Sequence, residues 1–140
     1  MTGTSLGQLR KYLEYLAHES GIDVVYSYDM GPNTTDFVMP KLKTIVINMH
    51  YRTSVSHAFR LAHEISHLLY GDYSSQNLYH FSPLCVTSEE RAAHVGAIHL
   101  IAKYVYKEVP REYRNYIDFM DILGLPASFE NMVIEELQEL

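Results

Sequence analysis

One short stretch near the middle of the chain limits the fold more than any other feature. In it, His63 and Glu64 are followed by His67, which gives the pattern H-E-x-x-H. On an α-helix, residues four positions apart lie on the same face, so both imidazole rings can point at one metal ion. Glu64 lies about 100° further round the helix, where its carboxylate misses the metal and still reaches a water molecule bound to it. The pattern therefore predicts a helix that carries two metal ligands and a general base.

The apolar residues around this pattern recur at helical spacing and predict a helix from residue 54 to residue 70. This apolar stripe consists of Ala58, Leu61, Ala62, Ile65, Leu68 and Leu69. The two histidines lie roughly opposite it, about 140–180° away round the helix. Ser54 or Ser56 can cap the start of the helix, and Gly71 can close its end. A surface helix with two solvated histidines is the simpler alternative, but the continuous stripe favours a helix with one buried face and one face turned to a cleft.

The composition excludes several classes of protein. A chain of 140 residues fits a single domain, and its net charge of −6 argues against nucleic acid as a direct partner. No apolar run approaches the roughly 18–20 residues of a membrane span, and residues 1–7 are too polar to begin a signal peptide. The single cysteine, Cys85, fits a reducing compartment and is expected to be a packed small residue. We therefore expect a cytoplasmic protein.

The order of the predicted elements indicates an α+β fold. The predicted strands cover residues 22–28, 36–39 and 44–49, and the predicted helices cover residues 5–19, 54–70, 88–107, 111–123 and 127–139. A polar, tyrosine-bearing loop is expected over residues 71–83. Strands that come mostly before the helices favour a small sheet with helices packed on it.

A catalytic zinc site needs a third protein ligand in addition to two histidines. The downstream candidates are His80, Glu89, Glu90, His94 and His99. We favour Glu90, because it begins the second long helix and shares a face with His94, four positions later. Small residues on this helix allow it to pack closely against the first one. Two alternatives remain: Glu90 could instead cap its own helix in the pattern Thr87-x-x-Glu90, and His80 is a rival ligand.

The role of His94 is open at this stage. It fits a partner that orients a ligand through a hydrogen bond, and it fits a solvated helix histidine equally well.

The two helices resemble the motifs of a known family. The stretch from Phe59 to Leu69 resembles the F-x-x-A-H-E-x-x-H-x-L of the ImmA/IrrE metallopeptidases. The run from Glu90 to Ile101 resembles the second motif of that family, E-x-x-A-N-x-F-A-x-x-L-L, and its metal glutamate falls on Glu90. The resemblance covers residues 5–102.

This resemblance implies one zincin-like metallopeptidase domain over residues 1–140. In it, a small three-stranded sheet packs on the HExxH active-site helix and on a second, glutamate-bearing helix. The core is expected near residues 5–107, followed by a C-terminal helical tail near residues 110–140.

The resemblance also implies a function. Similar proteins are zinc-dependent peptidases that cleave or inactivate a helix-turn-helix repressor and so derepress a gene block of a phage or mobile element. The implied Zn²⁺ ligands are His63, His67 and Glu90, and Glu64 activates the water. Donors to the oxyanion could come from the predicted loop that follows the helix, which carries Tyr73, Tyr79 and His80.

Two departures from the family pattern support other functions. His94 stands where the family usually has Asn or Asp, and Gly96 stands where it has Phe. A non-catalytic metal-binding adaptor that binds a repressor without cutting it is therefore an alternative. A partner in a toxin–antitoxin module is a third alternative, because related domains occur in such modules.

Overall fold

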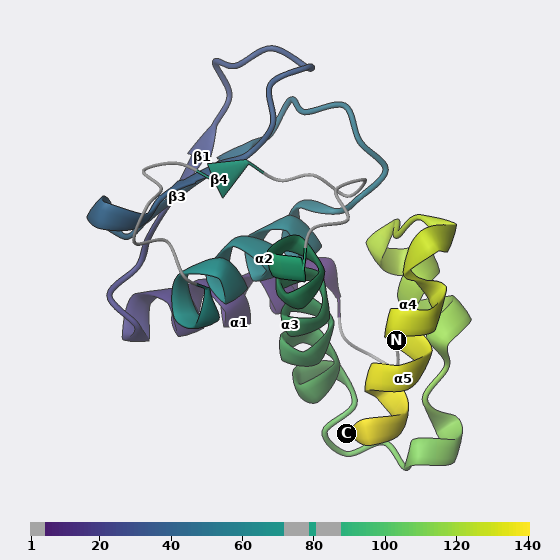
Figure 1. Ribbon diagram of the computed structural model, residues 1–140. Coiled ribbons are helices and arrows are strands. Elements are labelled where there is room, and N and C mark those ends of the chain that lie inside the picture. Colours follow the sequence, from purple (N-terminus) through teal and green to yellow (C-terminus); the bar gives the residue numbers. More distant parts are fainter. Residues whose placement is uncertain (1–4, 72–78, 81–87) are drawn as a thin grey trace.

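The computed structural model describes residues 5–71, 79–80 and 88–140, and shows a small sheet above a group of helices (Figure 1). The helices are α1 (Leu6–Glu19), α2 (His57–Tyr70), α3 (Ser88–Val105), α4 (Tyr116–Leu123) and α5 (Glu130–Glu139). The strands are β1 (Asp23–Ser27), β2 (Phe37–Met39), β3 (Thr44–Asn48) and β4 (Tyr79–His80). Short 3-10 turns cover Pro40–Leu42, Arg111–Tyr113 and Ala127–Phe129.

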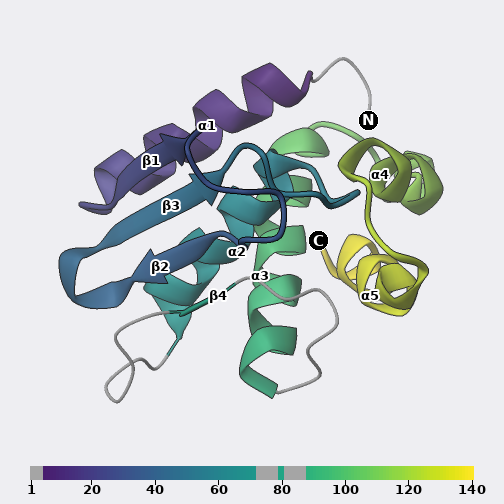
Figure 2. The same cartoon turned by 90° about the horizontal axis from the view of Figure 1, so that it is seen from above.

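The described strands form one mixed sheet in the order β1-β3-β2-β4 (Figure 2). β3 is parallel to β1 and antiparallel to β2, and Ile45 and Ile47 on it are fully buried. A strand with neighbours on both sides and helices beneath needs this β-branched, apolar composition. The predicted α+β fold with its three strands is confirmed. The fourth strand, β4, is only two residues long and lies in the stretch that the sequence analysis assigned to a loop.

Helix α2 forms the centre of the molecule, between the sheet on one side and α1 and α3 on the other (Figures 1 and 2). Its predicted apolar stripe is buried up to Leu68, whereas Leu69 is 39% exposed near the helix end. The face that carries His63 and His67 is buried as well, since α3 packs across it. The polar face of this helix therefore lies inside the protein, which explains why nearly every position of α2 is inaccessible to solvent.

The start of α2 is fixed by a hydrogen-bonded cap and a buried ion pair. Ser56, rather than Ser54, caps the helix: its hydroxyl accepts a hydrogen bond from the backbone N–H of Phe59 at 3.2 Å. Arg60 donates from Nη1 to both carboxylate oxygens of Asp36, at 2.8 and 2.9 Å. Asp36 lies just before β2, so this ion pair connects α2 to the sheet.

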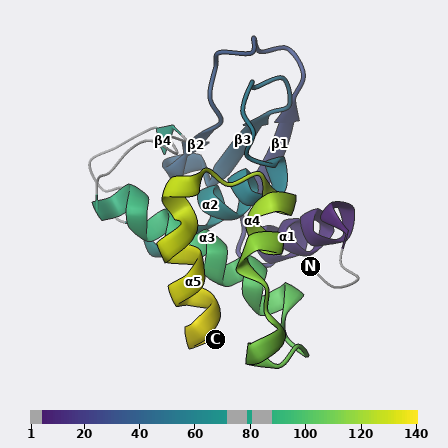
Figure 3. The ribbon, with the colours of Figure 1, turned by 90° about the vertical axis from the view of Figure 1, so that its right-hand side faces the viewer.

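The C-terminal segment, residues 116–140, packs against α3 and against the start of α2 (Figure 3). The backbone N–H of Ser56 donates to the carbonyl of Leu123 at 2.9 Å. Gly124 has a positive φ of 67°, and a Cβ there would collide with the backbone carbonyl of Ser54, so this close approach requires glycine. Among the described residues, no helix is long and apolar enough to cross a membrane.

Candidate metal centre

Helices α2 and α3 bring three side chains together in the interior. His67 Nε2 lies 2.6 Å from Glu90 Oε1, and His63 Nε2 lies 3.2 Å from Glu90 Oε2. One ligand atom from each of the three residues lies within 4.8 Å of the other two. All three side chains are buried. The spacing of four residues on α2 places both rings on one side, and the first turn of α3 adds the carboxylate.

The position of Glu90 bears on the capping alternative raised by the sequence. Each of its carboxylate oxygens faces a different imidazole ring. A side chain that only capped its own helix would have no reason to span these two rings. Thr87, the other half of the capping pattern, lies outside the described residues.

Glu64 occupies the same interior space but has a different environment. It is fully buried, and its Oε1 lies 3.4 Å from His63 Nε2. Burial raises the pKa of Glu64 well above its usual value, and the negative charges of Asp36 and Glu90 raise it further. A carboxyl group with a raised pKa holds a proton more readily than a solvated one, as a general acid and base must.

The electrostatics favour an ionised carboxylate at Glu90 and a neutral ring at His63. Burial alone would raise the pKa of Glu90, but hydrogen bonds to His63 and His67 outweigh that effect and lower it to about 2. Burial also lowers the pKa of His63, which favours the neutral imidazole. Metal binding requires this combination of ionised carboxylate and neutral imidazole.

The donor set fits a divalent metal ion. Two imidazole nitrogens and one carboxylate oxygen are the three protein ligands of one common type of catalytic zinc site. A buried cluster of this kind, with three polar side chains directed at one point, is costly unless its polar atoms are satisfied together. A cation held between His63, His67 and Glu90 would satisfy them.

His94 lies directly behind the first histidine. Its ring centroid is 4.5 Å from that of His63 and 4.7 Å from that of Phe129, which belongs to the C-terminal segment. His94 is 2% exposed, so the alternative of a solvated helix histidine is wrong. The hydrogen bond from His94 to a ligand stays a prediction.

Several residues singled out by the sequence lie outside the described part of the chain. They are Tyr73 and Cys85, together with the side chains of Tyr79 and His80, whose backbone forms β4. His99 is described, and it pairs with Glu136 on α5 through Nδ1 and Oε1 at 2.7 Å, away from the three converging residues.

Asp36 and Arg60 were not predicted from the sequence, although their charges influence the pKa of Glu64. Their separation of 24 positions along the chain hides the pairing. A usable signal was present, since Arg60 falls within a helix stretch that is otherwise mostly apolar.

An α+β fold with an HExxH helix crossed by a glutamate-bearing helix defines a zincin-like protein. The family model of the IrrE N-terminal-like domain, Peptidase_M78, matches residues 17–131. The chain therefore belongs to this family of metallopeptidases, which confirms the resemblance drawn from the two helix motifs. The chain has no significant match among curated proteins or among solved structures.

Proposed function

We propose that this chain is a zinc-dependent peptidase in which His63, His67 and Glu90 hold the metal and Glu64 is the general base. The observation that supports this proposal is the convergence of three buried ligand atoms within 4.8 Å, with the Glu64 carboxylate beside them. Membership of a metallopeptidase family supports it independently.

The reaction that follows uses the residues of this chain in separate roles. A bound zinc ion would supply a Lewis acid that polarises the peptide carbonyl and lowers the pKa of water to about 7. Glu64 takes a proton from the attacking water and passes it to the leaving amine. The His94 ring lies at a tilt against that of His63 and limits the movement of that ring. Tyr73, Tyr79 and His80 remain the proposed donors to the oxyanion.

We propose a helix-turn-helix repressor as the substrate, cleaved or inactivated in the cytoplasm by a single domain over residues 1–140. The basis is the resemblance of the two helix motifs to the ImmA/IrrE peptidases, whose role is derepression of a phage or mobile-element gene block. The net charge of −6 agrees with action on a protein rather than on nucleic acid.

The test of the catalytic role is the substitution Glu64→Gln, which keeps the shape of the side chain and removes the base. Zinc content should be unchanged, because Glu64 is not a ligand, and cleavage should fall by about 10²- to 10⁴-fold. Glu19→Gln, at an exposed position on α1, is the matched control and should behave like the unchanged protein. Undiminished cleavage by the Glu64 variant would refute the mechanism.

A metal-binding adaptor is the second proposal, and the complete burial of Glu64 is the observation that favours it. A general base that a substrate water cannot reach would leave the protein able to bind a repressor without cutting it. Incubation with the repressor, with and without chelator, separates the two proposals. Fragments that disappear with chelator indicate a peptidase, and an intact complex indicates an adaptor.

A further inference from the structure

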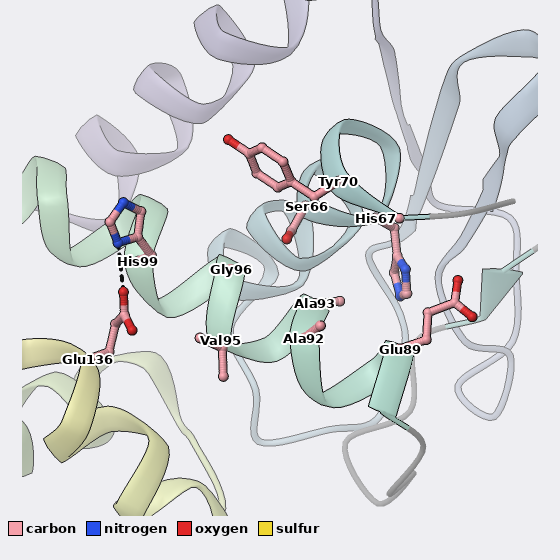
Figure 4. Close-up of a pocket in the computed structure, with 11 residues that line it drawn as sticks. Ser66, His67, Tyr70, Glu89, Ala92, Ala93, Val95, Gly96, His99 and Glu136 are labelled. Carbon is pink, nitrogen blue, oxygen red and sulfur yellow. Dashed lines mark hydrogen bonds and ion pairs between the residues drawn. The ribbon is translucent and has the colours of Figure 1, made fainter. Parts of the chain in front are cut away.

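A groove lies beside the three converging residues, between the C-terminal half of α2, the first half of α3, and α5 (Figure 4). Its volume is about 640 Å³. Ser66 and Tyr70 line it from α2, Ala92 and Gly96 line it from α3, and Glu136 lines it from α5. A volume of this size accommodates one or two amino-acid side chains of a bound polypeptide.

The groove exists because α3 presents small side chains there. Ala92 is exposed, and Gly96, one turn further along, lies against Ser66, since a Cβ on Gly96 would collide with the Ser66 hydroxyl. The two helices therefore cross closely at that point and then diverge. The surface left between them is apolar and open.

The groove is continuous with the metal centre. His67 lines the groove, and the same ring faces Glu90 at 2.6 Å. Glu89, which lies next to the proposed ligand Glu90, also lines it. A polypeptide held with one peptide bond at the proposed metal would thus have a neighbouring side chain beside the groove.

The charges around the groove have one sign. Its described lining contains two carboxylates, Glu89 and Glu136, and neither lysine nor arginine. Two imidazole rings are on the described lining: His67 faces Glu90 at 2.6 Å, and His99 is paired with Glu136 at 2.7 Å. An apolar groove with carboxylates at its edges complements a ligand that joins an apolar side chain to a cationic one.

We propose that this groove binds an apolar side chain of the polypeptide substrate that has a lysine or arginine next to it in sequence. The proposal rests on the proposed peptidase function and adds to it a preference at one substrate position. The apolar side chain occupies the surface over Ala92 and Gly96, and the cationic neighbour lies by Glu89 or Glu136.

The first experiment measures binding without cleavage. The zinc-loaded Glu64→Gln protein is titrated into a fluorescein-labelled glycine–serine peptide that contains one Leu-Lys pair, and anisotropy gives the affinity. Replacement of the leucine by serine should weaken binding by about 10- to 100-fold, the effect of losing one buried aliphatic side chain. Replacement of the lysine by glutamate should weaken it as well. Equal affinity for the leucine and serine peptides would overturn the proposal.

Groove variants then test the location. Ala92→Phe fills the groove from an exposed helix position and should abolish the preference for leucine. Ala127→Phe, the same change at an exposed position in the 3-10 turn before α5, is the matched control and should retain it. Glu89→Gln combined with Glu136→Gln should reduce the preference for lysine, whereas Glu19→Gln should not. A leucine preference that survives Ala92→Phe would place the binding elsewhere and overturn the proposal.

The groove proposal and the peptidase proposal can fail independently, and the two failures give different experimental results. If the unsubstituted protein cleaves the peptides without regard to the leucine or the lysine, the groove proposal is wrong and the peptidase stands. If it cleaves none of them while the Glu64→Gln protein still discriminates through Ala92, the groove stands and the peptidase proposal is wrong.

Discussion

At the scale of single residues, Glu90 links the two helices of the proposed metal centre. Its two carboxylate oxygens face two different rings, at 2.6 and 3.2 Å. Replacement by alanine removes one of three ligands, so zinc affinity should fall by more than the roughly 10- to 100-fold that follows loss of an outer-shell partner. Competition with a chelating dye measures this loss of zinc affinity.

The control is Glu89→Gln, one position earlier on the same helix, and its zinc affinity should stay within a few-fold of that of the unchanged protein. Equal zinc affinity of both variants would remove Glu90 from the ligand set.

The buried ion pair between Asp36 and Arg60 leads to a prediction about stability. Asp36→Asn keeps the volume but leaves the Arg60 charge buried without its partner, which costs about 3–5 kcal/mol in the free energy of unfolding. Urea denaturation measures this loss. The pair of Arg10 and Glu14, 3.8 Å apart with side chains 35% and 37% exposed, is the control, and Glu14→Gln should cost less than about 1 kcal/mol.

A second variant tests whether the unpaired charge of Arg60 is the cause of the lost stability. Arg60→Met added to Asp36→Asn removes the stranded charge and should recover part of the lost stability. A double variant that is less stable than Asp36→Asn alone would contradict the argument.

These two cases show what the sequence could predict about single residues. The position of Glu90 beside the two histidines was predictable, because helical spacing and small neighbouring residues place a helix start there. The partner of Arg60 was not, since no local pattern links a helix to a carboxylate 24 positions earlier. Long-range pairings follow from the packing of elements, which periodicity does not encode.

At the scale of elements, the first turn of α2 contains a histidine with a perturbed pKa. Burial lowers the pKa of His57, and the positive charges of Arg10 and Arg60 lower it further. Arg10 Nη1 lies 3.5 Å from His57 Nε2, and since a guanidinium only donates, this nitrogen must accept. The start of a helix also disfavours a cation. The contact between α1 and α2 therefore depends on the neutral form of His57.

Acid should weaken this contact between α1 and α2. The folded pKa of His57 lies below its unfolded value near 6.5, so the unfolded chain binds more protons as the pH falls below about 6.5, and stability is lost in that direction. Urea unfolding of the metal-free protein at about pH 8 and about pH 5.5 measures the drop in the free energy of unfolding. His57→Gln should make this drop smaller. The remaining pH dependence combines His63, whose pKa burial also lowers, with Glu64, whose raised pKa acts in the opposite direction.

The control for the pH experiment is His18→Gln, at an exposed position near the end of α1. This variant should show the same drop as the unchanged protein. A drop that His57→Gln leaves unaltered would exclude His57 as the sensitive group.

Helices and strands were predicted well where a single hydrophobic periodicity runs through the segment. The ends of helices were predicted less well, because they depend on contacts with other segments. The apolar stripe predicted α2, but the choice of Ser56 over Ser54 as its cap follows from contacts with the C-terminal segment. β4 escaped prediction because a strand of two residues has no periodicity of its own. Its place at the sheet edge comes from pairing with Phe37 and Val38 of β2.

At the scale of the whole molecule, the C-terminal segment reaches the proposed metal centre through one aromatic ring. Phe129 is almost fully buried, and its ring lies 5.8 Å from that of Phe59 and 4.7 Å from that of His94. His94 in turn lies 4.5 Å from His63. The C-terminal segment, for which the sequence motifs gave no role, therefore contacts the proposed ligand His63 indirectly, through Phe129 and His94.

Removal of this ring should affect both stability and metal binding. Phe129→Ala leaves a cavity between α2, α3 and the C-terminal segment, which costs about 3–5 kcal/mol. It also frees the His94 ring to move. The His63 ring then loses a packing contact that restricts its orientation, so zinc affinity should fall. Val133→Ala, at a buried position on α5, is the control for stability alone: it should lower the unfolding free energy while zinc affinity stays close to that of the unchanged protein.

The two measurements separate support of the metal centre from simple packing. Thermal unfolding of the metal-free proteins reports packing, and chelator competition on the folded proteins reports the site. Phe129→Leu restores most of the buried volume and should recover zinc affinity together with stability. If Phe129→Ala bound zinc as tightly as Val133→Ala did, the C-terminal segment would contribute only to the core, and the geometry of His63 would depend on α2 and α3 alone.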